Sequence, residues 1–274
     1  MTKEAAQRLE IELLFEALYR CYGYDFRSYS FESASRRVLR RVGMDGLGSI
    51  SELQHQILYN ENAADRLLQD LSINVTEIFR DPLFYLTLRQ QVLPLLDEYE
   101  HLKIWHAGCA TGEEVYSMAI MLSEEGYFPR SNLYATDFNN VALDKAKSGI
   151  FPLEQMRLYS KNYQAAGGKR SFADYYHANY NSAVMKGSLK ERTLFANHNL
   201  ATDSSFGEMQ MIVCRNVLIY FDKKLQDRVF NLFADSLCEG GILCLGSHET
   251  IKLSTLSRRF ETISGDQRIY RKKW

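Results

Sequence analysis

Residues 102–116, LKIWHAGCATGEEVY, have the composition of a buried strand, a tight turn and the start of a helix. The first letters are mostly apolar, and a run of small residues follows at 107–112. Glu113 and Glu114 then precede a segment whose apolar residues recur at helical spacing. This order is typical of a doubly wound sheet, in which the turn lets a nucleotide-like ligand approach the backbone. The chain is therefore predicted to contain a Rossmann-like α/β domain with a ligand site at this turn.

The turn does not have the features of a phosphate site. No Lys-Ser/Thr pair follows it as in a P-loop, and its glycines do not have the GxGxxG spacing. Two carboxylates at the start of a helix would repel a pyrophosphate, whereas they would attract a cationic ligand. S-adenosylmethionine, with its sulfonium and amino group, is such a ligand, and Glu113 is the better candidate to contact it. Thr111 and Glu114 also have the spacing of a capping box, so a purely structural turn is the alternative.

Composition and charge narrow the class of protein. The chain has 274 residues, of which 46% are hydrophobic, and this content is sufficient for a core. A net charge of −1 gives no global field that would favour nucleic acid or an acidic membrane. The five cysteines are scattered and never form CxxC, which indicates reduced thiols and no metal cluster. Because neither a signal peptide nor an apolar run of about 18 residues is present, we expect a cytoplasmic protein without membrane insertion.

The pattern of apolar residues divides the chain into two parts. Residues 1–72 have helical periodicity and no convincing strand, and strands alternate with helices from about residue 100. We therefore predict a helical domain at 1–72 and an α/β domain at 73–274. Within the second, residues 155–198 are rich in Tyr, Asn, Ser and Gly and have no long amphipathic helix. They predict a small β insertion, with a disordered loop as the alternative.

Several elements of the α/β domain can be placed by periodicity and capping signals. Strands are expected at 102–106, 132–136, 210–214 and 241–245, and helices at 112–125, 139–147 and 223–237. Asp81-Pro82 has the cap-and-proline signature of a helix start, and this helix is expected to run to about Leu96.

Two polar positions follow predicted strands, where ligands of α/β folds bind. Asp137 ends the second strand about 25 positions after Gly112, near the separation at which an acid binds a ribose. A helix cap is the alternative, although Asn139 is better placed for that purpose. Asn216 interrupts the apolar run after 210–214 and could contact the polar edges of a ligand. Tyr220 either lines the reactive end of the site or packs in the core.

Four arginines are concentrated in residues 31–42, FESASRRVLRRV. Arg36 and Arg40 lie one helical turn apart, as do Arg37 and Arg41, so a helix would place all four beside an apolar stripe. A solvated face is one interpretation. A docking surface for a partner is the other, because Arg favours bidentate contacts with carboxylate or phosphate.

The segments INVTEIFRD, HAGCATGEEVYSMAI, ATDFNNVALDKAKSGIF, NHNLAT, VCRNVLIYFD and GGILCLGSHE occur in this order after the arginine-rich helix. Together they resemble the CheR family, the methyltransferases that esterify glutamate side chains of bacterial chemoreceptors. The resemblance covers nearly the whole chain, and this order of motifs is far more specific than one nucleotide-binding turn.

The resemblance implies roles for the residues that match family motifs. The residues that it assigns to the cofactor are Asn74, Thr76, Arg80, Gly108, Glu113, Asp137, Asn199, Leu200, Arg215 and Asn216. For the catalytic step itself we expect Arg80 to orient the substrate carboxylate or the cofactor, and Tyr220 to shape the methyl pocket. Arg36, Arg37, Arg40 and Arg41 match the receptor-docking helix, and residues 155–198 match the small β-subdomain. We assign no role to His248 in the closing GSHET segment. On residue types alone, the loop that contains Arg80 would be taken as structural.

The implied reaction transfers the methyl group of S-adenosylmethionine to glutamate carboxylates of a chemoreceptor-like signalling protein. Its products would be glutamyl methyl esters and S-adenosylhomocysteine. The expected partner is the cytoplasmic helical region of a receptor or a similar coiled-coil protein, and nothing in the sequence demands more than a monomer. One alternative is a nucleic-acid methyltransferase whose arginine helix would grip phosphates, but the net charge of −1 argues against it. The other is a cofactor-binding signalling module without turnover.

Overall fold

The computed structural model describes residues 2–72 and 74–274, and the chain divides into two compact units. The first unit comprises Met1–Ile73 and Ile219–Arg228, and the second comprises Asn74–Leu218 and Val229–Trp274. The domain boundary was predicted between residues 72 and 73, and residue 73 lies outside the described residues. The sequence analysis had placed all of 219–228 in the α/β domain, and the structure differs in this respect.

The first unit is helical, and its segments have recognisable ends. Its helices are α1 (Lys3–Tyr22), α2 (Phe31–Met44), α3 (Ile50–Tyr59) and α4 (Glu61–Leu71). The side chain of Thr2 accepts a hydrogen bond from the Ala5 amide at 3.2 Å, and Ser49 accepts one from the Glu52 amide at the same distance. Such caps satisfy amides that have no partner within the helix. The segment at 219–228 joins this unit, because the Ser30 amide donates to the Tyr220 carbonyl at 2.8 Å.

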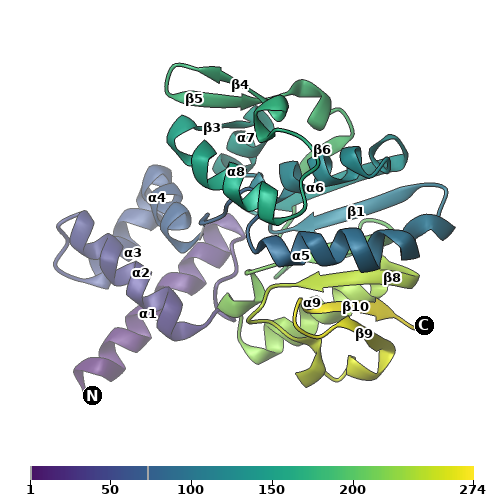
Figure 1. The fold of residues 1–274 in the computed structure, drawn as a ribbon. Helices are drawn as coiled ribbons and strands as arrows, with labels where there is room; N and C mark the ends of the chain where they lie inside the picture. The colour runs from purple at the N-terminus through teal and green to yellow at the C-terminus, as the bar shows by residue number, and fades with distance from the viewer. Residues whose placement is uncertain (1, 73) are drawn as a thin grey trace. The chain divides into compact units, whose positions relative to one another are not determined.

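The second unit is built on a mixed sheet (Figure 1). Within the described residues the sheet has seven strands in the order β6-β2-β1-β7-β8-β10-β9. Its members are β1 (Leu102–Ala107), β2 (Ser131–Asp137), β6 (Thr193–Asn197), β7 (Met209–Cys214), β8 (Leu237–Leu245), β9 (Phe260–Ser264) and β10 (Ile269–Lys272). The first five strands in this order are parallel, and β10 is antiparallel to both of its neighbours. The order reverses between β1 and β7, which is the place where α/β sheets bind ligands. The predicted Rossmann-like fold is confirmed.

Helices connect the parallel strands of this sheet. They are α6 (Glu113–Glu124), α7 (Asn140–Ser148) and α9 (Lys223–Ser236). Asn139 begins α7 as predicted, with its side chain accepting hydrogen bonds from the amides of Val141 and Ala142. Short 3-10 helices occupy Phe128–Arg130, Leu153–Gln155, Phe172–Tyr175, Gly187–Leu189, Leu218–Tyr220, Ile251–Leu253 and Ser257–Arg259.

The helix predicted to begin after Asp81 changes its pitch along its length. It consists of α5 (Pro82–Thr87), a π-helical stretch (Leu88–Val92) and a 3-10 stretch (Leu93–Glu98). Pro94 has no amide hydrogen, so the regular α-helical ladder cannot continue through it. Asp81 lies at the start of α5, but its side chain makes no capping hydrogen bond, and its expected capping role is wrong.

The inserted region of the second unit differs from the segment predicted at 155–198. Its three-stranded sheet has the order β3-β5-β4 and includes β3 (Ile150–Pro152), which precedes that segment. The other two strands, β4 (Tyr176–Asn179) and β5 (Ser182–Met185), form a hairpin. The region also contains an amphipathic helix, α8 (Met156–Ala165), although no long one was expected. Residues 193–197 do not belong to the insertion, because they form β6 of the main sheet.

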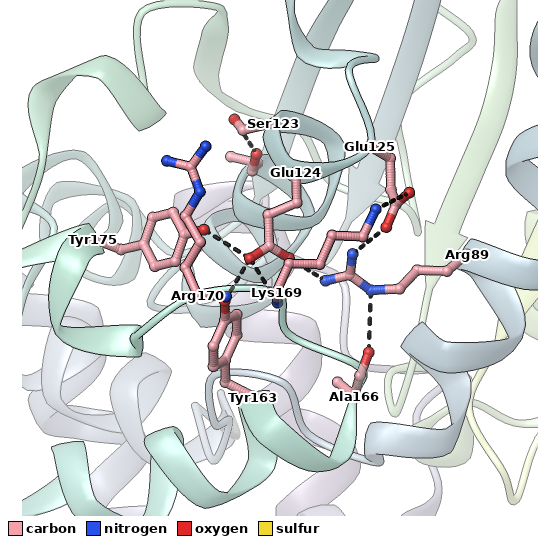
Figure 2. Close-up of polar contacts among 10 residues, drawn as sticks. Arg89, Ser123, Glu124, Glu125, Tyr163, Ala166, Lys169, Arg170 and Tyr175 are labelled. Atoms are coloured by element: carbon pink, nitrogen blue, oxygen red, sulfur yellow. Dashed lines mark hydrogen bonds and ion pairs between the residues drawn. The ribbon is translucent and has the colours of Figure 1, made fainter.

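A buried carboxylate fastens this inserted region to α6 (Figure 2). The side chain of Glu124 is 1% exposed and accepts hydrogen bonds from the hydroxyls of Tyr163 and Tyr175. It also accepts one from the Lys169 amide at 3.1 Å and pairs with Arg89 at 2.5 Å. Burial opposes ionisation, but these donors together lower the pKa of Glu124 below its ordinary value. Glu124 is therefore a charged junction between segments that lie far apart in the sequence.

Across the part of the chain that the structure describes, no helix combines the length and the apolar character needed to cross a membrane.

Candidate functional site

The turn after β1 is shaped by two glycines with left-handed backbone. Gly108 has φ 79°, and a Cβ added to it would lie 2.6 Å from Cγ2 of Val217. Gly112 has φ 93°, and a Cβ there would lie 2.8 Å from Cβ of Ala146. Neither position tolerates a side chain, because contacts this short do not occur between carbon atoms. The small residues of this turn therefore serve close packing, as the structural alternative predicted.

Asp137 lies at the carboxyl end of β2 beside this turn. One carboxylate oxygen accepts the Ala110 amide at 3.0 Å, and the other accepts the Asn139 amide at 2.9 Å. The side chain is buried, and burial raises its pKa despite these hydrogen bonds. Together with the amide of Phe138 these groups fix the direction of the carboxylate, and its remaining lone pair can accept a further hydrogen bond.

Glu113 is the first residue of α6 and is only 6% exposed. The hydroxyl of Thr111 donates to its carboxylate at 2.7 Å. Burial raises the pKa of Glu113 to about 7, although that hydroxyl and a backbone hydrogen bond act in the opposite direction. No Lys, Arg or His of the described residues lies within ion-pair distance of this carboxylate. Glu113 is thus a buried acid without an ion-pair partner among the described residues, and only the more distant charge of Lys145 adds to the groups that oppose the rise in its pKa.

The capping box considered for Thr111 and Glu114 is not formed. Gly112 is the residue before α6, and no side chain caps this helix. Glu114 instead accepts a hydrogen bond from Nδ1 of His106 at 3.0 Å and pairs with Arg215 at 3.2 Å. Burial opposes ionisation of Glu114, but His106 and Arg215 lower its pKa overall. The two neighbouring glutamates therefore differ, because among the described residues Glu114 forms an ion pair with Arg215 and Glu113 forms none.

The guanidinium of Arg215 is engaged by protein groups. It donates to Asp81 at 2.6 Å and to Glu114 at 3.2 Å, and it lies over the ring of Phe84 at 4.1 Å. The side chain is 3% exposed. These contacts join the end of β7 to the start of α6 and to the loop before α5. The Nε of this guanidinium is buried and has no hydrogen-bond partner among the described residues, so the predicted contact of Arg215 with the cofactor stays a prediction.

The loop that contains Arg80 has a strained backbone. Phe79 and Asp81, on either side of Arg80, have φ values of 53° and 56°. Such left-handed conformations of non-glycine residues cost about 1–3 kcal/mol each and cluster at functional sites. The Phe79 amide donates to the Ser117 hydroxyl at 2.8 Å, and Nη1 of Arg80 donates to the Val75 carbonyl at 2.9 Å. This strain is a feature that residue types alone did not indicate, and the predicted role of Arg80 stays a prediction.

The remaining predicted cofactor residues of the second unit lie in two loops. Asn74 and Thr76 are half-buried in the loop before Arg80. Asn199 follows β6, and its side-chain oxygen accepts the Ala201 amide at 2.9 Å. Leu200 is buried beside it. Because β6 pairs in parallel with β2, the Asn199 turn lies at the same edge of the sheet as the turn after β2.

The sequence analysis missed Glu249. Asn216 has φ 60°, and its backbone amide donates to the buried carboxylate of Glu249 at 3.1 Å. Glu249 follows the end of β8 in the GSHET segment, to which no role had been assigned. No local pattern identifies it, because three of its four amide partners belong to residues 216–218, which follow another strand.

The arginine-rich helix α2 does not present four arginines to solvent. Arg41 is buried, with Nε donating to Asp70 at 2.5 Å and Nη1 donating to Asp45 at 3.1 Å. The predicted docking role is therefore wrong for Arg41, because both carboxylates that it binds belong to its own unit and hold it inward. Arg36 and Arg40 are exposed, as a docking surface requires.

Tyr220 and Arg37 lie together in the first unit. The guanidinium of Arg37 lies over the ring of Tyr220 at 5.5 Å, and it also donates to the Asp70 carbonyl at 3.2 Å. Both side chains are half-buried. The structure thus brings the predicted cofactor residues together in the second unit, and it places Tyr220 and the four arginines in the first.

The two parts of the chain match the two domains of one family. The all-alpha domain of CheR methyltransferases matches residues 9–72, and their S-adenosylmethionine-binding domain matches residues 74–269. The chain belongs to the CheR methyltransferase family. The Cher3 protein of Pseudomonas putida is 50% identical over 272 residues, which are 99% of this chain and 100% of that protein. "Chemotaxis protein methyltransferase 2" of Pseudomonas aeruginosa is 30% identical over 246 residues, 88% of this chain and 86% of that protein.

A third relative is the "Chemotaxis protein methyltransferase" of Listeria innocua. It is 30% identical over 232 residues, 84% of this chain and 85% of that protein. Membership of the CheR family confirms the fold class and S-adenosylmethionine as the cofactor.

The charge of the site fits this cofactor. In the described part of the chain, neither Glu113 nor Asp137 has an ion-pair partner, and burial raises the pKa of both. A buried carboxylate in this state is stabilised by a nearby positive charge, and S-adenosylmethionine has two cationic groups. Among the described residues there is no cluster of three metal-binding side chains.

Proposed function

We propose that this CheR-family chain methylates glutamate carboxylates of a chemoreceptor-like signalling protein. The observation that supports this proposal most directly is Glu113, a buried acid at the small-residue turn with no cationic partner in the described residues. It belongs to the same unit as the strained loop of Arg80. S-adenosylmethionine would supply the methyl group, and we assign its cationic amino acid part to Glu113 and its ribose to Asp137.

The proposed reaction needs no general base. An exposed glutamate has a pKa of about 4.3, so at neutral pH the substrate is already a carboxylate nucleophile. The protein would then act by orientation, holding the carboxylate in line with the methyl group and the sulfur. Such orientation can contribute several kcal/mol to catalysis. Exclusion of water helps as well, because the opposite charges of the reactants neutralise each other during transfer.

Arg80 is our candidate for orienting the substrate carboxylate or the cofactor. Its backbone is held between two left-handed residues, and among the described residues its guanidinium makes one hydrogen bond, to the Val75 carbonyl. An Arg held in this way still has donors for a carboxylate. Tyr220 is our candidate for shaping the methyl pocket, with its ring held by Arg37.

The exposed Arg36 and Arg40, together with the half-buried Arg37, are our candidate docking surface for an acidic helical region of the receptor. Guanidinium groups bind carboxylates in a bidentate way, and glutamate-rich helices display such carboxylates.

The cysteines support a location in the cytoplasm. All five are free thiols, as expected in a reducing compartment, where the cytoplasmic region of a receptor would be accessible to this chain.

The test is transfer of labelled methyl from S-adenosylmethionine to a helical receptor fragment rich in glutamate. The label should be released as methanol by mild base, as expected for a carboxyl methyl ester. A fragment with the same helix and alanine in place of each glutamate is the matched control and should remain unlabelled. Label that is stable to base, or label on nucleic acid instead, would show that the proposed acceptor is wrong.

A further inference from the structure

The carboxylate of Glu249 accepts hydrogen bonds from four main-chain amides, three of which belong to the turn that follows β7. One oxygen of Glu249 accepts the amides of Val217 at 2.8 Å and Leu218 at 2.7 Å. The other accepts the amides of Gly246 at 2.6 Å and Asn216 at 3.1 Å. The side chain is 4% exposed. Glu249 thus binds two chain segments at once, its own turn after β8 and the turn after β7.

The amides of residues 216–218 need such an acceptor. The strand β7 ends at Cys214, so these three consecutive N–H groups are not part of the sheet ladder. Consecutive amides that point to one side form a concave site for an anion. Here the protein fills that site with its own carboxylate. The left-handed backbone of Asn216 is a conformation that persists only when its surroundings hold it.

Two glycines permit this close arrangement. A Cβ on Gly246 would lie 2.7 Å from the Asn216 amide nitrogen and 2.8 Å from the Glu249 carboxylate. A Cβ on Gly108 would lie 2.6 Å from the side chain of Val217, which belongs to the same turn. The turn held by Glu249 therefore also packs directly against the cofactor turn after β1. A shift of residues 216–218 would disturb the two turns that flank the reversal of strand order.

We propose that Glu249 is a positioning residue for the cofactor site. Its carboxylate fixes the turn after β7, and this turn sets the orientation of Asn216 toward the cofactor. The inference rests on the proposed contact between Asn216 and the cofactor. It differs from a general stabilising role, because it requires Glu249 to act on binding through Asn216.

The experiment is a double-mutant cycle on binding of S-adenosylhomocysteine, measured by calorimetry with the full chain. Glu249→Gln keeps the size of the side chain but turns an NH₂ group toward amide donors. We expect Glu249→Gln and Asn216→Ala each to raise the Kd by tenfold or more. In the double variant, Glu249→Gln should add less than a threefold change to the effect of Asn216→Ala. Fully multiplicative effects, or an unchanged Kd for Glu249→Gln, would overturn the proposal.

Two further variants keep the result interpretable. Glu261→Gln removes an exposed acid from β9 and should leave the Kd unchanged, so it controls for the loss of one charge. Glu249→Asp keeps a carboxylate on a shorter side chain and should bind between wild type and Glu249→Gln. If Glu249→Gln does not fold, the same cycle with Glu249→Asp decides the question.

The outcomes separate this inference from the proposed methyl transfer. S-adenosylhomocysteine binds without any methyl acceptor. A wild-type chain that binds it but does not label the receptor fragment would refute only the proposed acceptor. A wild-type chain that does not bind it would refute the proposed cofactor contacts and this inference together.

Discussion

Glu113 makes cofactor binding dependent on pH in a predictable direction. Its pKa is about 7 because it is buried without a cationic partner in the described residues. The neutral carboxyl form has no charge with which to attract the cationic end of the cofactor. We therefore expect affinity to increase as pH rises through 7, and we expect binding near pH 7 to release a proton from Glu113.

The size of this effect follows from the pKa. With a pKa of about 7, roughly one-eleventh of Glu113 is ionised at pH 6 and roughly ten-elevenths at pH 8. If only the carboxylate form binds, the Kd should be about tenfold larger at pH 6 than at pH 8, which corresponds to about 1.4 kcal/mol of binding free energy. Glu113→Gln should weaken binding at pH 8 by tenfold or more, because a hydrogen bond to a charged group contributes about 1.5–3 kcal/mol.

The assay is calorimetric titration with S-adenosylhomocysteine at several values between pH 6 and 8. The amino group of the ligand also titrates at alkaline pH, so the informative quantity is the ratio of the wild-type Kd to the Glu113→Gln Kd at each pH. The ligand's own titration cancels in this ratio, and buffers of different ionisation heat report the released proton. A ratio that does not change between pH 6 and 8 would refute the assignment of Glu113 as the acid that binds the cation.

Three further predictions concern other parts of the chain. Arg80→Ala should lower methyl transfer by more than tenfold with an unchanged unfolding temperature, and wild-type turnover in this variant would remove the orienting role. Replacement of both Arg36 and Arg40 by Ala should raise the KM for the receptor fragment and leave the Kd of S-adenosylhomocysteine unchanged, whereas unchanged kinetics would end the docking proposal. Glu124→Gln should lower the free energy of unfolding by about 1–3 kcal/mol, because the hydroxyls of Tyr163 and Tyr175 lose a charged acceptor while Arg89 keeps only Glu125 as a carboxylate partner, and chemical denaturation measures this value. A loss below about 0.5 kcal/mol would show that the junction in Figure 2 contributes little to stability.

Several features of the fold were predictable because they depend on neighbouring residues. The strand, turn and helix at 102–116 follow from apolar periodicity and small residues, and the structure has β1, the turn and α6 there. The Asn139 cap of α7 was predicted because capping uses amides two or three residues away. The inserted region was placed less well, since its strands are short and its helix α8 is weakly marked by polar composition.

The ion-pair partners were not predictable from local pattern. Helical spacing put Arg41 on a basic face, yet the fold brings it to Asp70, which is 29 positions away. Arg215 matched a cofactor motif, and its guanidinium is instead bound to Asp81, 134 positions away. A guanidinium binds whichever carboxylate the fold places within reach, and sequence spacing does not contain that information.

The sequence by itself determined the order of strands and helices, the family, the cofactor and the candidate residues at the strand ends. These depend on helical and strand periodicity, on caps and on motifs that are contiguous in the chain. Only the tertiary structure decided that Glu113 has no ion-pair partner among the described residues, that Arg41 and Arg215 are bound to carboxylates, and that Glu249 holds the Asn216 turn. Burial and long-range hydrogen bonds arise when distant segments pack together, and they set which charges are compensated and which remain for a ligand.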